Sequence, residues 1–183
     1  MKYSMIGYGS LLSHQSLSRT IPDKPFTPIL VRGYKRLFNL AVSKGRNPDV
    51  LNVQKARGKT FNGVLFHVDE QELRRIMERE EDYNLEETHA YDFRTKRMVG
   101  KGFVCADYVV GIDRLKRLPE KKYFILCREA AYHISLPFGE YWDQTTYLAD
   151  GNTVTQWIGT HPAYDTIDVS PPSRVSPNYR RLK

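Results

Sequence analysis

The stretch Tyr8-Gly9-Ser10-Leu11-Leu12 lies close behind an expected opening strand, Met1–Ile6. A strand that breaks into a glycine-containing turn, with a hydroxyl beside the glycine, lets several backbone N–H groups converge on one point. Such a turn can hold an anion or a carbonyl oxygen. The stretch therefore predicts a binding loop at the end of the first strand.

Hydrophobic patterning and turn signals predict the elements that follow this loop. The expected strands are Ile29–Val42 with a bend at Gly33, Leu51–Ala56 and Thr60–Val68 joined around Gly58, and a hairpin of His89–Arg97 and Phe103–Val110 that turns near Gly100 and Gly102. The expected helices are a short one capped by Ser13, one from Asp69 to about Tyr83, one over Lys121–Ser135, and short ones at Glu140–Leu148 and Val154–Ile158. Strands dominate and do not alternate strictly with helices. The pattern favours an α+β fold with a mixed, strongly curved sheet or a small β-barrel flanked by helices.

The chain of 183 residues is long enough for one domain with a proper core. Periodicity fades after His161-Pro162, and Pro171-Pro172 is typical of a loose segment. We therefore expect one domain over residues 1–160 and an extended basic C-terminal tail over residues 161–183.

Composition narrows the classes of function. Cys105 and Cys127 lack metal-site spacing, so we expect two reduced, buried thiols and no metal. No apolar run approaches membrane length and no secretory signal is apparent, which predicts a cytoplasmic protein without a membrane partner. The formal charge of +7 points weakly to anionic partners. Without an aromatic-interleaved RNA motif, a nucleic-acid partner is not expected.

One acid on the expected Asp69 helix occupies an apolar position. Advancing about 100° per residue places Leu73, Ile76 and Met77 on one buried stripe, and Glu80 falls in its centre. The same wheel points Arg79 away from the stripe. A buried carboxylate costs several kcal/mol unless it is paired or lines a wet pocket, and its pKa rises. Two interpretations follow: a general acid/base, or a carboxylate that pairs with an arginine or a tyrosine hydroxyl at the end of the helix.

Several short motifs, in this order, resemble the γ-glutamylcyclotransferase superfamily. They are Tyr8-Gly9-Ser10-Leu11-Leu12, Val31-Arg32-Gly33-Tyr34-Lys35-Arg36, Asn62-Gly63-Val64-Leu65-Phe66, Ile76 to Glu80 with Arg79-Glu80, and Leu136-Pro137-Phe138-Gly139-Glu140-Tyr141. The likeness covers roughly residues 1–150. The chain departs from the family's pattern at Met77 and Glu81.

The resemblance implies a cofactor-independent enzyme that releases 5-oxoproline from a γ-glutamyl amine, amino acid or peptide. It implies Glu80 as the catalytic acid/base and a small γ-glutamyl substrate as the partner, without indicating an oligomeric state. The implied substrate-binding residues are Tyr8, Gly9, Ser10, Leu11, Leu12, Tyr108 and Tyr123.

Other functions compete with this one. A dinucleotide-binding loop is disfavoured because Leu12 stands where GxGxxG needs its third glycine. A Ser10 nucleophile would need a histidine and an acid, and the five histidines form no recognisable arrangement. A non-enzymatic small-ligand or protein-interaction module on the same fold stays open, because Met77 and Glu81 depart from the pattern.

Overall fold

The computed structural model describes residues 2–40, 50–80, 84–106 and 118–167. Its six-stranded sheet comprises β1 (Tyr3–Gly7), β2 (Phe26–Leu40), β3 (Val50–Val68), β4 (Asn84–Asp92), β5 (Met98–Ala106) and β6 (Thr146–Tyr147). The helices are α1 (His14–Leu17), α2 (Glu70–Arg79), α3 (Lys121–Ile134), α4 (Leu136–Thr145) and α5 (Val154–Trp157). No helix in these ranges is long and apolar enough to cross a membrane.

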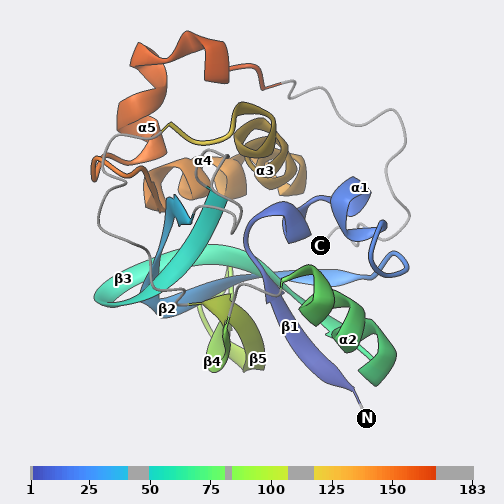
Figure 1. Ribbon diagram of the computed structural model, residues 1–183. Coiled ribbons are helices and arrows are strands. Elements are labelled where there is room, and N and C mark those ends of the chain that lie inside the picture. Colours follow the sequence, from blue (N-terminus) through green and yellow to red (C-terminus); the bar gives the residue numbers. More distant parts are fainter. Residues whose placement is uncertain (1, 41–49, 81–83, 107–117, 168–183) are drawn as a thin grey trace.

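The sheet is mixed and strongly curved. Its order is β3-β1-β5-β4-β2-β6, and β2 also pairs with β3, so the pairings return to their starting strand. Strand β1 pairs antiparallel with β3 and parallel with β5, and β6 pairs parallel with β2. Figure 1 shows α3, α4 and α5 gathered on one side of β2 and β3, with α2 beside β1. The predicted α+β class with a curved mixed sheet is confirmed.

Aromatic packing joins the helices to the sheet. Phe38 of β2 lies 5.4 Å from Phe124 of α3 and 6.3 Å from Trp142 of α4, measured between ring centroids. All three side chains are fully buried or nearly so. These contacts fix α3 and α4 over the end of the sheet where β1 stops.

One long strand, β3, replaces the two short ones that we expected around Gly58. Strand β3 is continuous, and its pairing with β2 shifts from Arg32↔Thr60 to Tyr34↔Lys55. Gly33 and Gly58 both have positive φ at this irregularity, +84° and +78°. The glycines therefore bend the paired strands without ending either one.

The hairpin turn lies earlier than predicted. It follows Asp92, whose carboxylate accepts hydrogen bonds from the Arg94 and Thr95 amides at 3.0 and 2.6 Å. Gly102 instead lies within β5, where an added Cβ would come within 2.8 Å of Leu65. The prediction was wrong because this glycine serves close packing across the sheet rather than a turn.

Two helix boundaries also differ from the predictions. Helix α4 begins at Leu136 rather than Glu140, because Pro137 sits in its first turn and Ser135 caps it through the Phe138 amide. Helix α2 begins after the predicted Asp69 cap and stops at Arg79. The part of the prediction beyond residue 80 lies outside the described residues.

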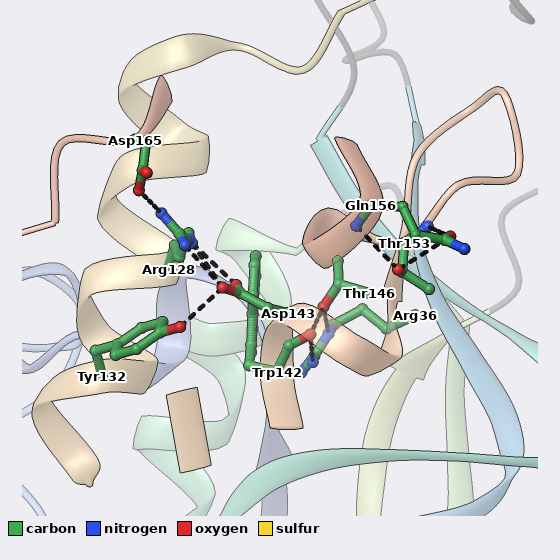
Figure 2. A network of polar contacts seen from close by, with 9 residues as sticks. All are labelled: Arg36, Arg128, Tyr132, Trp142, Asp143, Thr146, Thr153, Gln156 and Asp165. Atoms are coloured by element: carbon green, nitrogen blue, oxygen red, sulfur yellow. Dashed lines mark hydrogen bonds and ion pairs between the residues drawn. The ribbon is translucent and has the colours of Figure 1, made fainter. Parts of the chain in front are cut away.

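The first residues of the expected tail pack against α3. A short 3₁₀ turn spans Pro162–Tyr164, and the Tyr164 hydroxyl donates to the Pro119 carbonyl at 3.1 Å. Asp165 pairs with Arg128 of α3 at 2.8 Å, and the same guanidinium pairs with the buried Asp143 of α4 (Figure 2). Residues 168–183 lie outside the described part of the chain.

A fully buried arginine on β2 joins four parts of the fold. Arg36 donates through Nε to Thr146 Oγ1 at 2.8 Å, and through Nη1 to the Asn62 carbonyl at 2.6 Å and the Tyr8 carbonyl at 3.4 Å. Its Nη2 donates to Asn62 Oδ1 at 3.0 Å and to the Trp142 carbonyl at 3.3 Å. Figure 2 shows it reaching toward α4. Burial lowers the pKa of Arg36 to about 9, which leaves it charged near pH 7.

Arg36→Met should destabilise the fold by about 2–5 kcal/mol, because it leaves several buried carbonyl and amide oxygens without a hydrogen-bond donor. Arg32→Met on the same strand is the matched control: Arg32 is exposed over the Tyr91 ring, so its loss should cost about 1 kcal/mol or less. Urea unfolding of the two variants measures the difference. Equal stabilities would contradict a central role for Arg36.

Candidate functional site

The predicted binding loop leaves the sheet directly after β1. Ser10–Leu12 forms one 3₁₀ turn with Gly9 at its N-cap, and the Leu12 amide donates to the Gly9 carbonyl at 2.9 Å. The N–H groups of Ser10 and Leu11 precede this first hydrogen bond of the turn, so the turn itself cannot satisfy them. The loop therefore directs main-chain donors away from its own backbone.

Gly9 is required by a close approach from α3. A Cβ added at this position would lie 2.8 Å from the Tyr123 hydroxyl oxygen. Tyr123 follows the α3 N-cap, where the Glu120 carboxylate accepts from its amide. Because no side chain separates them, the tyrosine hydroxyl can face the loop backbone directly.

Glu80 lies at the end of α2, as its C-cap. Asp69 and Glu72 cap the start of α2 reciprocally, as predicted. At the other end the Glu80 amide closes the last turn on the Ile76 carbonyl at 2.9 Å. The Glu80 side chain is 15% exposed, and its Oε1 lies 3.3 Å from Arg79 Nε. Both sequence interpretations meet here, since the acid is buried and also paired with an arginine.

The loop and the acid line one hollow. The part of this space that the centre of a water molecule can reach is about 10 Å³. Its walls come from the end of β1 and the loop, α2, β3, β5 and α3. The lining residues are Tyr8, Gly9, Ser10, Leu11, Leu51, Glu80, Cys105 and Tyr123.

Six of the eight predicted site residues lie around this hollow. Leu12 does not line it: its side chain is 2% exposed within the core, and its amide is bonded inside the loop. Tyr108 lies outside the described residues. Tyr8 is fixed by its hydroxyl, which donates to the Cys105 carbonyl at 2.7 Å.

Two residues that line the hollow, Leu51 and Cys105, were not predicted, and Arg79 was given no role in the site. Leu51 lines the hollow from β3 and Cys105 lines it from β5. They lie there because of strand pairings that no local sequence motif predicts. The prediction that Arg79 points away was wrong, because its guanidinium donates to Ser10 Oγ at 2.7 Å and to other groups of the loop and α1. The Arg-Glu pair was the signal that could have drawn attention to it.

Burial sets the protonation behaviour of the site. It raises the pKa of Glu80 above that of an ordinary carboxyl group, and the Arg79 charge opposes part of that rise. Burial likewise raises the pKa of the Cys105 and Cys127 thiols to about 12. Both cysteines are free and buried, as predicted, and both are protonated thiols near pH 7.

The Ser10 hydroxyl is held by a group that cannot accept a proton. Its Oγ accepts from Arg79 Nη2, and a guanidinium stays protonated and offers only donors. A serine nucleophile needs a neighbouring base instead. The geometry therefore favours Ser10 as part of the loop scaffold.

Comparison with known proteins yields solved structures alone. No protein-family model and no curated protein sequence matches the chain. A structure described as a γ-glutamyl cyclotransferase superposes with a TM-score of 0.64 at 14% identity, covering 96% of this chain and 92% of that one. An uncharacterized human protein, loc79017, gives a TM-score of 0.64 at 15% identity with the same coverage. A solution structure from Arabidopsis thaliana gives 0.51 at 14% identity, covering 96% and 94%.

These likenesses extend over nearly the whole described chain and agree with the mixed, curved sheet and its flanking helices. At 14–15% identity they concern the arrangement of the backbone. The chain therefore has the γ-glutamyl cyclotransferase-like fold that its motifs led us to expect.

Proposed function

We propose that the protein is a γ-glutamylcyclotransferase-type enzyme, which releases 5-oxoproline from a γ-glutamyl amine, amino acid or peptide. The observation that carries the proposal is the hollow that Glu80 shares with the Gly9–Leu11 backbone. The shared fold with a structure described as a γ-glutamyl cyclotransferase supports it.

The reaction is an intramolecular aminolysis. The α-amine of the γ-glutamyl group attacks its own γ-carbonyl carbon, a new C–N bond closes the five-membered lactam, and the old C–N bond to the leaving amine breaks. Glu80, ionised at the start, takes a proton from the α-ammonium group. It then returns that proton to the departing nitrogen as the old C–N bond breaks. The second proton that the attacking nitrogen loses on becoming the lactam N–H follows it, so the amine leaves as an ammonium ion and the carboxylate is regenerated.

The environment of Glu80 suits both steps. Partial desolvation raises its pKa, which makes its carboxylate a stronger base than an exposed one. The nearby Arg79 charge favours the ionised form, in which Glu80 can accept a proton.

The loop supplies the complementary half of the chemistry. The amides of Gly9, Ser10 and Leu11 are the proposed donors to the developing oxyanion, or to the substrate's carboxylate. The Leu12 amide is excluded from this role by its bond to the Gly9 carbonyl. Tyr8, Leu51 and Tyr123 form the walls that hold the substrate curled, where much of the rate of a ring closure arises.

A panel of γ-glutamyl compounds tests the activity directly. Incubation with the protein should yield 5-oxoproline, detected by mass spectrometry, from at least one member. An N-acetylated version of the same compound should yield none, because its nitrogen cannot attack. Hydrolysis of the acetylated compound would instead indicate an ordinary amidase, and binding without any product would indicate a non-enzymatic ligand module.

Glu80→Gln should lower kcat by about 10²–10⁴-fold, since the amide cannot shuttle the proton. Glu78→Gln, on an exposed position of the same helix, is the matched control and should keep wild-type turnover. The acid limb of the wild-type kcat/KM profile should report a pKa above that of an ordinary carboxyl group. Full activity in Glu80→Gln would rule out the assigned role.

Glu80→Gln should also stabilise the fold at neutral pH. The folded-state pKa of Glu80 is raised, so ionisation costs stability as pH rises above the unfolded-state value. Below that value the carboxyl is protonated in both states and the cost disappears. Urea unfolding should therefore show a stability gain at pH 7.5 that is absent near pH 4, with no such change for Glu78→Gln. A variant that is less stable than the wild type at pH 7.5 alone would contradict the assigned burial cost.

A further inference from the structure

The Arg79 guanidinium makes four hydrogen bonds through its two Nη nitrogens and an ion pair through Nε. Nη1 donates to the Ser16 carbonyl and to Thr20 Oγ1, both at 3.0 Å. Nη2 donates to Ser10 Oγ at 2.7 Å and to Ser16 Oγ at 2.8 Å, while Nε lies 3.3 Å from Glu80 Oε1. A guanidinium carries five N–H donors and no acceptor. In this geometry Arg79 does not line the hollow, and both of its Nη nitrogens are engaged within the protein.

These contacts connect segments that are distant in sequence. Ser10 belongs to the binding loop, Ser16 to α1, and Thr20 to the turn that follows it. Glu80 ends α2, far along the chain. The Arg79 side chain is 23% exposed, so its bonds are partly shielded from solvent. One side chain therefore sets where the loop lies relative to the acid.

We propose that Arg79 is the positioning residue of the site: its guanidinium holds the Ser10 loop and the Glu80 carboxylate in one fixed geometry without touching the substrate. The consequence for turnover rests on the proposed function, whereas the positioning itself does not. Arg79 acts through Ser10 and Glu80 and takes no part in proton transfer.

Arg79 also sets the electrostatic environment of Glu80. Among the residues that the structure describes, the other titratable groups that face the acid are the Cys105 thiol from β5, the Tyr8 phenol after β1 and the Tyr123 phenol from α3, with the Cys127 thiol of α3 beyond. None of these groups is a cation. Removal of the Arg79 charge should therefore raise the pKa of Glu80 further.

Three substitutions separate the two effects. Arg79→Gln removes both the charge and the fork of donors. Arg79→Lys keeps a cation but offers only three donors from one point, so it cannot reproduce the fork. Ser10→Ala leaves the Arg79–Glu80 pair in place and removes one anchor of the loop. Arg75→Gln, on an exposed position of the same helix, is the matched control.

Two measurements on the substrate-free protein decide the positioning role. Carbon-detected NMR titration of the Glu80 carboxyl should give a higher pKa in Arg79→Gln than in the wild type, with little change in Arg79→Lys or Ser10→Ala. Hydrogen exchange of the Leu12 amide, which bonds inside the loop, should accelerate about tenfold or more in all three variants. An unchanged Glu80 titration together with unchanged loop exchange in Arg79→Gln would overturn the proposal.

Turnover provides a third measurement if the wild type is active. Arg79→Gln should lower kcat/KM by about 10–100-fold and move its acid limb to higher pH. Ser10→Ala should lower kcat/KM without moving that limb, and Arg79→Lys should not rescue the activity. A wild type without turnover would reject the proposed function, while the titration and exchange data would still judge Arg79. If Arg79→Gln fails to fold, the milder Ser10→Ala variant is used instead. Faster exchange of its Leu12 amide than in the wild type supports the positioning role, and unchanged exchange contradicts it.

Discussion

The fold depends on the burial of one guanidinium among neutral acceptors. Arg36 is fully buried, and its donors reach the end of β1, strand β3, helix α4 and strand β6. Transfer of a charge into the interior is costly unless its hydrogen bonds are satisfied. Each element that supplies an acceptor is therefore held at a defined distance from the others. The Tyr8 carbonyl is one of those acceptors, which fixes the backbone at the point where the binding loop begins.

A second arginine, closer to the solvent, binds the loop in a similar way. Arg36 binds the main chain just before the loop, and Arg79 binds the hydroxyl of Ser10 within it. The loop is thus held by two guanidinium groups from different elements, one deep and one partly exposed. Glu80 benefits from this arrangement, because a carboxylate beside a fixed cation can be buried without losing its charge entirely. Rigid surroundings of this kind are what preorganised chemistry requires.

Signals that span only a few residues could be predicted from the sequence. The Asp69–Glu72 cap needs partners three positions apart, and the loop after β1 shows its glycine and serine directly. Predictions failed where the role of a residue depends on contacts with a neighbouring strand of the sheet. Gly102 is small because neighbouring strands crowd it, which no local pattern distinguishes from a turn. Cys105 faces the hollow only because β5 pairs with β1, and that pairing is invisible in a single sequence.

The parallel pairing of β1 with β5 also bears on how the protein acquires its structure. Met5 and Ile6 lie beside Phe103 and Val104, partners that leave the ribosome about a hundred residues later. Until those residues arrive, β1 exposes an unpaired edge. Contacts of such long sequence separation slow folding, because the loop-closure entropy is lost before the contacts form. The binding loop is thus translated well before the strand that supports it.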